Sequence, residues 1–411
     1  MKARFDFETP VNRRDSGSYK WDADLPEGVV LTPAQRERVI PLWVADMDFQ
    51  AAPCILDALR RRVEHGVFGY TRVPDSYYDA VIRWFGQRHG LALKRDWIQY
   101  TTGVVPALSA VIKALARPGE GVIVQTPVYN CFFSSIRNNE CRIVASPLLR
   151  RDLPDGAFTY EMDYEGLEAA CADPSNRILL LCNPHNPAGR RWRAEELRRA
   201  GEIAFRHGVV VVSDEIHCEI VQPGTAYVPF AALGESFLHG SVTLCSPSKS
   251  FNTAGLQIAN IITDRPDWRE KIDKAININE ICDVNPFGPV AAEAAYSDEG
   301  ACWLEALDEV IWHNYETLRA QFRSALPEFP VAELEATYLA WIDTSVLPIS
   351  SEAIEAELLR GEQVWINAGS MYGADGFIRI NLACPSARLQ EGLDRIVTGL
   401  RRLLAELPRI A

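Results

Sequence analysis

Short, almost uninterrupted apolar runs mark the middle of the chain. They recur between residues 121 and 263, and polar or helix-forming stretches separate most of them. Buried parallel strands have this pattern, because helices cover both faces of such a sheet. The pattern therefore predicts a mainly parallel α/β sheet, with strands at 121–126, 177–182, 209–213, 242–246 and 258–263.

Helical periodicity precedes and separates these runs. Ile55, Leu59 and Val63 recur every four residues, which predicts an amphipathic helix. A second helix is predicted from near Pro106 to the Pro-Gly pair at 118–119, because proline favours the first turn of a helix and Pro-Gly ends one.

The pattern changes after about residue 295. A smaller α+β unit is predicted there, because helical and alternating patterns follow one another over short stretches. Its elements are a long helix at 302–325, a strand at 337–343, a helix near 352–359, a strand at 377–382 and a last helix ending at 404. We therefore expect an N-terminal segment at 1–50 that packs with the small domain, a large domain at 51–295 and a small C-terminal domain at 296–411.

Composition and charge narrow the classes of function. The 411 residues carry a formal net charge of −13, which argues against a nucleic-acid partner but leaves room for a small anionic cofactor. No apolar run approaches the roughly 20 residues that span a bilayer, and residues 1–10 lack the apolar core of a signal peptide. We expect a cytoplasmic protein without a membrane partner. The ten cysteines are scattered and form no C-x-x-C pair, so no disulfide framework is predicted. His217 and Cys218 are adjacent, which is not the spacing of zinc ligands, so no metal site is predicted.

Polar side chains follow three of the apolar runs at the point where each predicted strand ends. Asn186 lies in the Asn-Pro-His-Asn-Pro segment after the second run, Asp214 follows the third, and Lys249 ends the Ser-Pro-Ser-Lys segment after the fourth. Ligands of open α/β sheets bind beyond the carboxyl ends of the strands. An amide, a carboxylate and a lysine are therefore expected at one edge of the sheet.

This set of side chains suits pyridoxal phosphate (PLP). PLP needs a lysine that binds its aldehyde as an imine, a carboxylate that keeps its pyridine nitrogen protonated, and a donor to its phenolic oxygen. Its phosphate needs backbone N–H groups at a helix N-terminus, which residues 101–106 offer ahead of a predicted helix. Each residue alone has an ordinary explanation as a surface lysine, a helix cap or a turn former. The joint pattern, in this order, predicts a PLP site.

The sequence resembles fold-type I PLP enzymes, and within them the MalY/PatB-type cystathionine β-lyases. The resemblance runs from about Lys20 to the C-terminus. It implies an α/β fold-type I PLP-dependent transferase fold, with a mainly parallel seven-stranded sheet in the large domain and a smaller α+β C-terminal domain. It rests on LWVADMDF at 42–49, FGYT at 68–71, TGVVPAL at 102–108, CNPHNPAGR at 182–190, SDEIH at 213–217, SPSKSFNTAGL at 246–256 and TYLAWID at 337–343.

The resemblance also implies roles for individual residues. Lys249 binds the cofactor and later moves protons, Asp214 pairs with the pyridine nitrogen, and Tyr129 stacks on the ring. Arg379 holds the substrate carboxylate as a bidentate fork, and Trp43 belongs to the substrate pocket. The other implied cofactor contacts are Asn186 and His217 at the phenolic oxygen, and Gly103, Val104, Val105, Ser246 and Tyr70 at the phosphate. Tyr70 would come from a second subunit, so a homodimer with shared sites is implied.

The implied reaction is β-elimination of a cysteine thioether, such as cystathionine, to a thiol, pyruvate and ammonia. The same residues serve transamination, so an aminotransferase or a specialised biosynthetic relative acting on an amino-acid-derived substrate remains open. A third hypothesis is that the protein is catalytically inactive and binds a regulatory partner. The presence of Lys249, Asp214 and Arg379 argues against that hypothesis. Many aminotransferases carry an arginine eight positions after the lysine, where this chain has Gln257. That departure favours the lyase.

Overall fold

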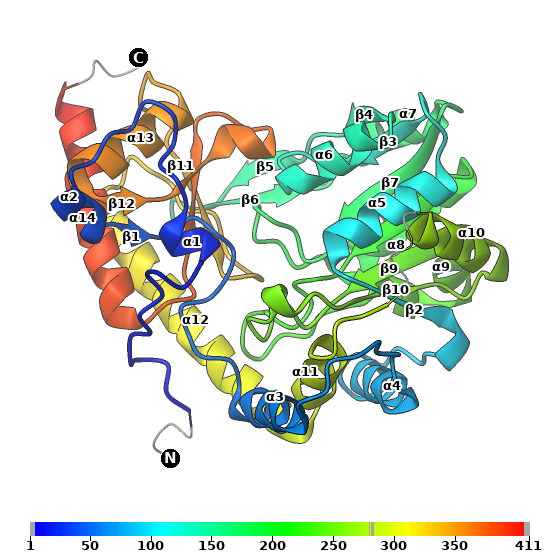
Figure 1. Ribbon diagram of the computed structural model, residues 1–411. Coiled ribbons are helices and arrows are strands. Elements are labelled where there is room, and N and C mark those ends of the chain that lie inside the picture. The colour runs from blue at the N-terminus through cyan, green and yellow to red at the C-terminus, as the bar shows by residue number, and fades with distance from the viewer. Residues whose placement is uncertain (1–4, 279, 281–282, 407–411) are drawn as a thin grey trace.

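A seven-stranded sheet lies at the centre of the larger part of the molecule (Figure 1). The computed structural model describes residues 5–278, 280 and 283–406. In spatial order the strands are β2 (Ile98–Thr101), β10 (Ala259–Ile262), β9 (Ser241–Cys245), β8 (Val210–Asp214), β7 (Asn176–Cys182), β3 (Gly121–Val124) and β4 (Arg142–Ala145). Strand β10 runs antiparallel to both neighbours, and the remaining pairs are parallel. The expectation of a mainly parallel, seven-stranded sheet is confirmed.

All five apolar runs form strands of this sheet, namely β3, β7, β8, β9 and β10. The two edge strands, β2 and β4, were not predicted. Strand β4 is exposed at both ends and only half-buried between them, and the two central residues of β2 are half-buried. An edge strand pairs on one side only and therefore needs no continuous apolar run.

Helices cover both faces of the sheet. Along β7, Ile178 and Leu180 face one layer, whereas Leu179 and Leu181 face the other, and all four are fully buried. The first layer contains α5 (Val104–Leu115), α6 (Asn130–Asn138) and α10 (Pro266–Asn277). The second contains α7 (Tyr164–Ala172), α8 (Ala194–Arg206) and α9 (Glu235–His239). This two-sided burial explains why the central strands read as uninterrupted apolar runs.

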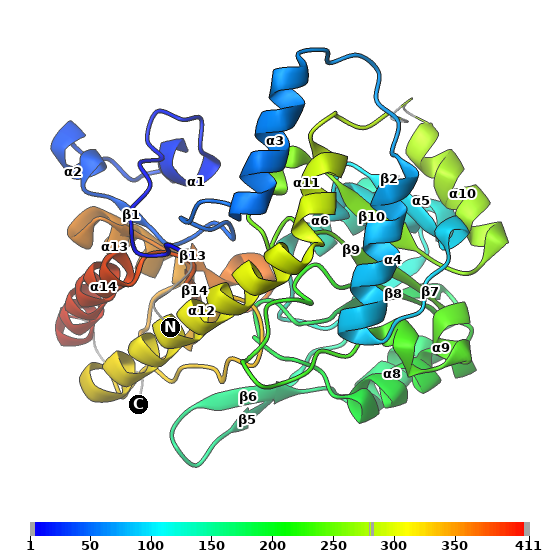
Figure 2. The same ribbon diagram turned by 90° about the horizontal axis from the view of Figure 1, so that it is seen from below.

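A second, smaller sheet lies in the C-terminal part. Its antiparallel strands follow the order β11 (Leu339–Asp343), β14 (Phe377–Asn381) and β13 (Asn367–Ala368). Strand β1 (Ile40–Pro41) pairs in parallel with β12 (Val364–Trp365), so the N-terminal segment lies against this part. The long helix α12 (Asp298–Ala325) runs between the two parts (Figure 2). It starts four residues before the predicted position, because the Ser297 side chain caps it by accepting from the Gly300 N–H.

The remaining helices complete the two parts. Helix α11 packs against both α3 and α4 beside the large sheet (Figure 2), and α13 packs on α14 in the C-terminal part. Their bounds are α1 (Tyr19–Asp22), α2 (Pro33–Glu37), α3 (Pro53–His65), α4 (Asp75–His89), α11 (Gly288–Ala295), α13 (Ser351–Glu362) and α14 (Ser386–Glu406). Within the described ranges, no helix has both the length and the apolarity to cross a bilayer.

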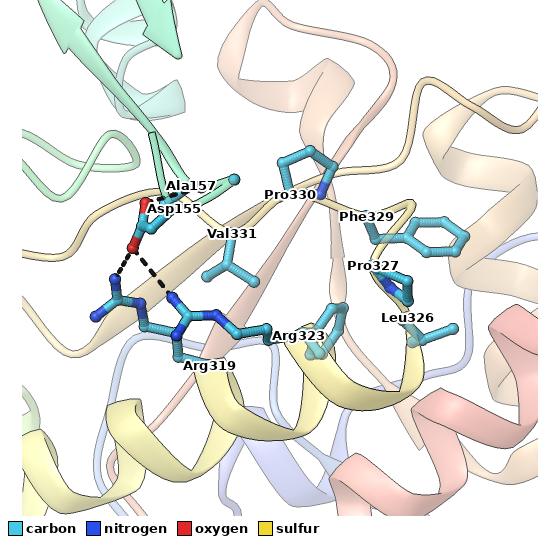
Figure 3. Close-up of a pocket in the computed structure, with 11 residues that line it drawn as sticks. Asp155, Ala157, Arg319, Arg323, Leu326, Pro327, Phe329, Pro330 and Val331 are labelled. Carbon is cyan, nitrogen blue, oxygen red and sulfur yellow. Dashed lines mark hydrogen bonds and ion pairs between the residues drawn. The ribbon is translucent and has the colours of Figure 1, made fainter. Parts of the chain in front are cut away.

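A hairpin of β5 (Leu149–Asp152) and β6 (Phe158–Glu161) extends from the large sheet to α12. Asp155 at its tip accepts hydrogen bonds from Arg319 and Arg323 of α12, with an Nη2–Oδ2 distance of 3.0 Å for Arg323 (Figure 3). A pocket of about 130 Å³ lies beside these ion pairs, and the rest of its lining is mostly apolar. These contacts pin the hairpin to α12, and no residue predicted for the chemistry lines the pocket.

A buried carboxylate fixes the N-terminal segment. Asp48 is fully buried and lies 2.8 Å from Arg13 Nη1 and 3.2 Å from Lys20 Nζ. The Trp21 indole N–H donates to Asp48 Oδ1 at 2.9 Å, and Arg388 Nη1 of α14 lies 3.3 Å from Oδ2. One carboxylate thereby ties the start of the chain to its last helix.

We predict that Asp48→Asn lowers the free energy of unfolding by about 3 kcal/mol, because the amide leaves the surrounding cations without their buried counter-charge. Urea unfolding followed by tryptophan fluorescence measures the change. Asp57→Asn is the control, since Asp57 and Arg60 form an exposed pair at 2.6 Å and such pairs contribute little. Equal shifts of the two midpoints would show that the buried network has no special weight.

Candidate active site

The carboxyl ends of the central strands and the N-terminus of α5 surround a cavity of about 190 Å³. Strand order places β7, β8 and β9 side by side, so the residues that follow them meet at one edge. The structure brings eight of the predicted residues together in the cavity wall: Gly103, Val104, Val105, Tyr129, Asn186, Asp214, His217 and Lys249.

Lys249 and Asp214 place two ionisable groups in this buried cavity. Burial lowers the pKa of the Lys249 amine to about 8, and the charge of Arg379 acts in the same direction. Burial raises the pKa of Asp214 to about 7, although the Ile216 N–H donates to its Oδ1 at 3.1 Å. The Lys249 amine donates to the Ala45 carbonyl at 2.7 Å. A ligand that brings a cation against Asp214 therefore fits this cavity.

The N-terminus of α5 forms the anion-binding end. Gly103 is the N-cap, and the first intrahelical bond runs from the Ala107 N–H to the Gly103 carbonyl at 3.0 Å. The N–H groups of Val104 and Val105 precede that bond, so helix geometry leaves them available for a ligand. The first turn contains no acidic side chain that would repel an anion. Thr102, whose hydroxyl the sequence analysis did not single out, also lines the cavity.

Ser246, predicted as a phosphate ligand, lies behind the cavity wall. Its hydroxyl donates to the Ile258 carbonyl at 2.7 Å and accepts from the Ser248 N–H at 3.1 Å. Ser248 itself lines the cavity. The sequence contains both serines in one Ser-Pro-Ser segment. The turn after β9 decides that Ser248 faces the cavity and Ser246 does not.

Arg379 and Asn186 join the two sheets at the cavity. Arg379 comes from β14, is almost fully buried, and donates from Nη1 to Asn186 Oδ1 at 3.1 Å. Its guanidinium carbon lies 4.7 Å from the Tyr372 ring centroid. Among the described groups, the buried Arg379 Nε has no hydrogen-bond partner. The Asn186 oxygen is engaged by Arg379, so the amide nitrogen is the donor left for a ligand.

The sequence did not predict how the side chains of Trp43 and Tyr70 are placed. The Trp43 indole stacks on Trp365 at 4.4 Å, and the Trp43 carbonyl accepts from Arg379 Nη2 at 2.9 Å. The backbone of Trp43, rather than its ring, thus meets the predicted carboxylate clamp. Tyr70 lies fully exposed between α3 and α4.

His217 contributes a neutral imidazole. Burial, reinforced by the charges of Lys249 and Arg379, lowers its pKa to about 3. Its ring lies 5.7 Å from the Tyr338 ring in an edge-on contact. Nδ1 is buried and has no partner among the described residues. A neutral imidazole carries one N–H, so His217 can donate a single hydrogen bond to a ligand oxygen.

Glu219 anchors the loop that carries Asp214 and His217. Its buried carboxylate accepts from Trp84 at 2.6 Å, lies 2.7 Å from His89 Nε2, and accepts from Arg88 at 3.1 Å. His89 and Glu219 also lie close to Cys218, as a metal site would require. We assign no metal here, because groups of α4 already engage both carboxylate oxygens.

Comparison with known proteins finds similarity along almost the whole chain. The family model for aminotransferase class I and II matches residues 37–396. Cystathionine beta-lyase PatB of Bacillus subtilis (strain 168) is 40% identical over 396 residues, which cover 96% of this chain and 99% of PatB. Protein MalY of Escherichia coli (strain K12) is 33% identical over 402 residues, covering 97% and 99%. The crystal structure of cystalysin from Treponema denticola, which contains pyridoxal 5'-phosphate, superposes with a TM-score of 0.90 at 35% identity, covering 97% and 99%.

The raised pKa of Asp214 predicts how the stability of the cofactor-free protein depends on pH. The folded protein keeps a proton on Asp214 up to about pH 7, whereas the unfolded chain releases it near pH 4. Stability should therefore fall as the pH rises between these values, by on the order of 4 kcal/mol for this group. Asp214→Asn cannot ionise and should lose this slope. Thermal unfolding at several pH values measures it, and parallel curves for the two proteins would contradict the prediction.

Proposed function

Because the chain belongs to the aminotransferase class I and II family, we propose that it is a PLP-dependent carbon–sulfur lyase of the MalY/PatB type. It eliminates the sulfur substituent of cystathionine or of another cysteine thioether as a thiol, and water then hydrolyses the released aminoacrylate to pyruvate and ammonia. The observation that carries the proposal is the meeting of Lys249, Asp214 and the α5 N-terminus in one cavity.

PLP fits this cavity by the chemistry of its wall. The protonated pyridine nitrogen is the cation that the buried carboxylate of Asp214 requires, and Lys249 binds the aldehyde carbon. Asn186 and His217 each offer a donor to the phenolic oxygen, and Tyr129 offers a ring surface. The proposed phosphate ligands are the N–H groups of Gly103, Val104 and Val105 and the hydroxyls of Thr102 and Ser248, and the Ser246 hydroxyl supports the turn behind them by accepting from the Ser248 N–H.

Different residues of the chain bind the substrate and transfer its protons. PLP supplies the electron sink that weakens the bonds at the substrate Cα. Arg379 binds the substrate carboxylate and thereby sets which Cα bond is aligned for breaking. Lys249 takes the proton from Cα and returns a proton to the sulfur that leaves Cβ, which it can do because its lowered pKa leaves part of the amine neutral near pH 8.

The proposal of elimination rather than amino transfer rests on the similarity to the lyases. Among the described residues that line the cavity, Lys249 is the one cation, and Arg379 adds one guanidinium beside it. Gln257 lines the cavity at the position where many aminotransferases carry an arginine.

The exposed position of Tyr70 supports a homodimer with shared sites. Its neighbours Val63, Val67 and Phe68 are each more than half exposed, and the Phe68 ring lies 5.6 Å from Phe287. A contiguous apolar surface of this kind is typical of an interface. In the proposed dimer, Tyr70 of one subunit reaches the phosphate end of the other cavity.

Three further features belong to this proposal. The substrate is a small amino acid, and the enzyme works in the cytoplasm. The chain divides into an N-terminal segment at 1–50, a large domain at 51–295 that holds PLP, and a small domain at 296–411 that carries Arg379.

Purified enzyme is expected to release thiol, pyruvate and ammonia from cystathionine or a smaller cysteine thioether, without an added keto acid. Lys249→Ala should abolish release and should also lose the visible absorbance of lysine-bound PLP. Arg379→Ala should reduce kcat/KM for every amino-acid substrate, because the carboxylate loses its fork. Fast amino transfer to 2-oxoglutarate, with no thiol from any thioether, would replace the lyase by an aminotransferase.

Mixing two inactive variants tests the shared site. Tyr70→Phe and Lys249→Ala subunits should each be inactive as homodimers, while a mixed dimer contains one intact site. Random exchange should therefore restore about one quarter of the wild-type activity per subunit. Sedimentation of the mixture confirms the dimer. No recovery after proven exchange, or a fully active monomer, would remove Tyr70 from the site.

A further inference from the structure

Tyr338, a residue with no role in the site so far, shares a hydrogen-bond acceptor with Lys249. The Lys249 amine donates to the Ala45 carbonyl oxygen at 2.7 Å, and the Tyr338 hydroxyl donates to the same oxygen at 3.0 Å. Tyr338 is fully buried, and burial raises the pKa of its hydroxyl well above the ordinary value. The hydroxyl therefore remains protonated and remains a donor throughout the neutral range.

The backbone that carries Tyr338 is strained and firmly held. The preceding residue, Thr337, has φ 71°, a conformation that β-branched residues rarely adopt. The Thr337 N–H donates to the Ile220 carbonyl at 2.8 Å, and its hydroxyl accepts from the Leu339 N–H at 3.2 Å. The Leu382 N–H donates to the Tyr338 carbonyl at 2.8 Å. Strain that several bonds maintain beside a site is typical of residues that are positioned for function.

The shared acceptor is fixed from its other side as well. Asn381 donates to the carbonyls of Val44 and Asp46, with 2.7 Å to the second, and so holds both neighbours of Ala45. The Ala45 carbonyl consequently cannot turn toward one donor and away from the other. Because two donors meet one oxygen, the Tyr338 hydroxyl takes up part of the negative charge of that oxygen and leaves less of it to stabilise the ammonium form of Lys249.

We propose that Tyr338 is a positioning residue for Lys249: it occupies part of the Ala45 carbonyl and so keeps the lysine amine available as a base. The proposal rests on the proposed function in so far as Lys249 moves protons there. When Lys249 is not bound to the cofactor, its amine donates to the Ala45 carbonyl. Tyr338 prevents that contact from holding the amine in its charged form.

The test removes only the Tyr338 hydroxyl. Cofactor-free, full-length protein is treated with an amine-acylating reagent at pH values from about 6 to 10, and acylation of Lys249 is quantified by peptide mass spectrometry. In Tyr338→Phe the midpoint of the curve should move to higher pH, and labelling near pH 8 should fall about three-fold. The ring still fills its place in the core, so the fold should be kept, and thermal unfolding verifies this.

Tyr315→Phe is the matched control, because the Tyr315 hydroxyl is also buried but donates to the Ala332 carbonyl at 3.1 Å, outside the cavity wall. Its labelling curve should coincide with that of the wild type. An unmoved midpoint in Tyr338→Phe, or an equal shift in both variants, would overturn the proposal.

A kinetic measurement separates this result from the lyase assignment. With a thioether substrate, Tyr338→Phe should lower kcat more than it changes KM, and the pH profile of kcat should shift in the same direction as the labelling curve. Unchanged kcat with a shifted labelling midpoint would overturn the catalytic part of the proposal. If the wild type releases no thiol, the lyase function fails, while the labelling curve still decides whether Tyr338 acts on Lys249.

Discussion

The burial of a lysine and an aspartate in one cavity is the constraint on which the rest of the site depends. Removing either charge from water costs free energy, and the pKa of each group moves toward its neutral form. Asp214 and Lys249 do not compensate one another fully, so the cavity favours a ligand that carries its own cation and an electrophilic carbon. The anion-binding turn of α5 adds the third requirement. These three demands together select the cofactor more narrowly than any single motif does.

The cavity is assembled from segments that are remote in sequence. The large sheet supplies Asp214 and Lys249 at its strand ends, whereas Arg379 comes from the small sheet and Ala45 from the N-terminal segment. The carboxylate of Asp48 keeps that segment in place through contacts that reach α14. The electrostatics of the cavity therefore rest on a network that lies outside its wall.

The sequence predicted the parts of the structure that repeat a local rule. Continuous apolar runs identified the buried strands, and the residues after those runs identified Asn186, Asp214 and Lys249 of the cavity wall. The sequence did not predict the features of the structure that depend on tertiary contacts. Edge strand β4 is not buried on both faces, so its sequence contains no continuous apolar run. The orientation of the Trp43 ring depends on its stacking with Trp365. Tyr338 appeared in the sequence only as part of a motif, because its proposed role depends on a hydrogen bond to the Ala45 carbonyl, 293 positions away.

The tie between Asp48 and Arg388 has a consequence for the order in which the protein is made. During synthesis the large sheet can form once residue 262 has left the ribosome, but β14 and α14 are still to be translated. Until they emerge, the nascent chain has its lysine and carboxylate without the arginine that orients a substrate. A chain that ends prematurely before β14 therefore lacks the arginine that orients a substrate, and it also lacks the α14 contact that holds the N-terminal segment against the cavity.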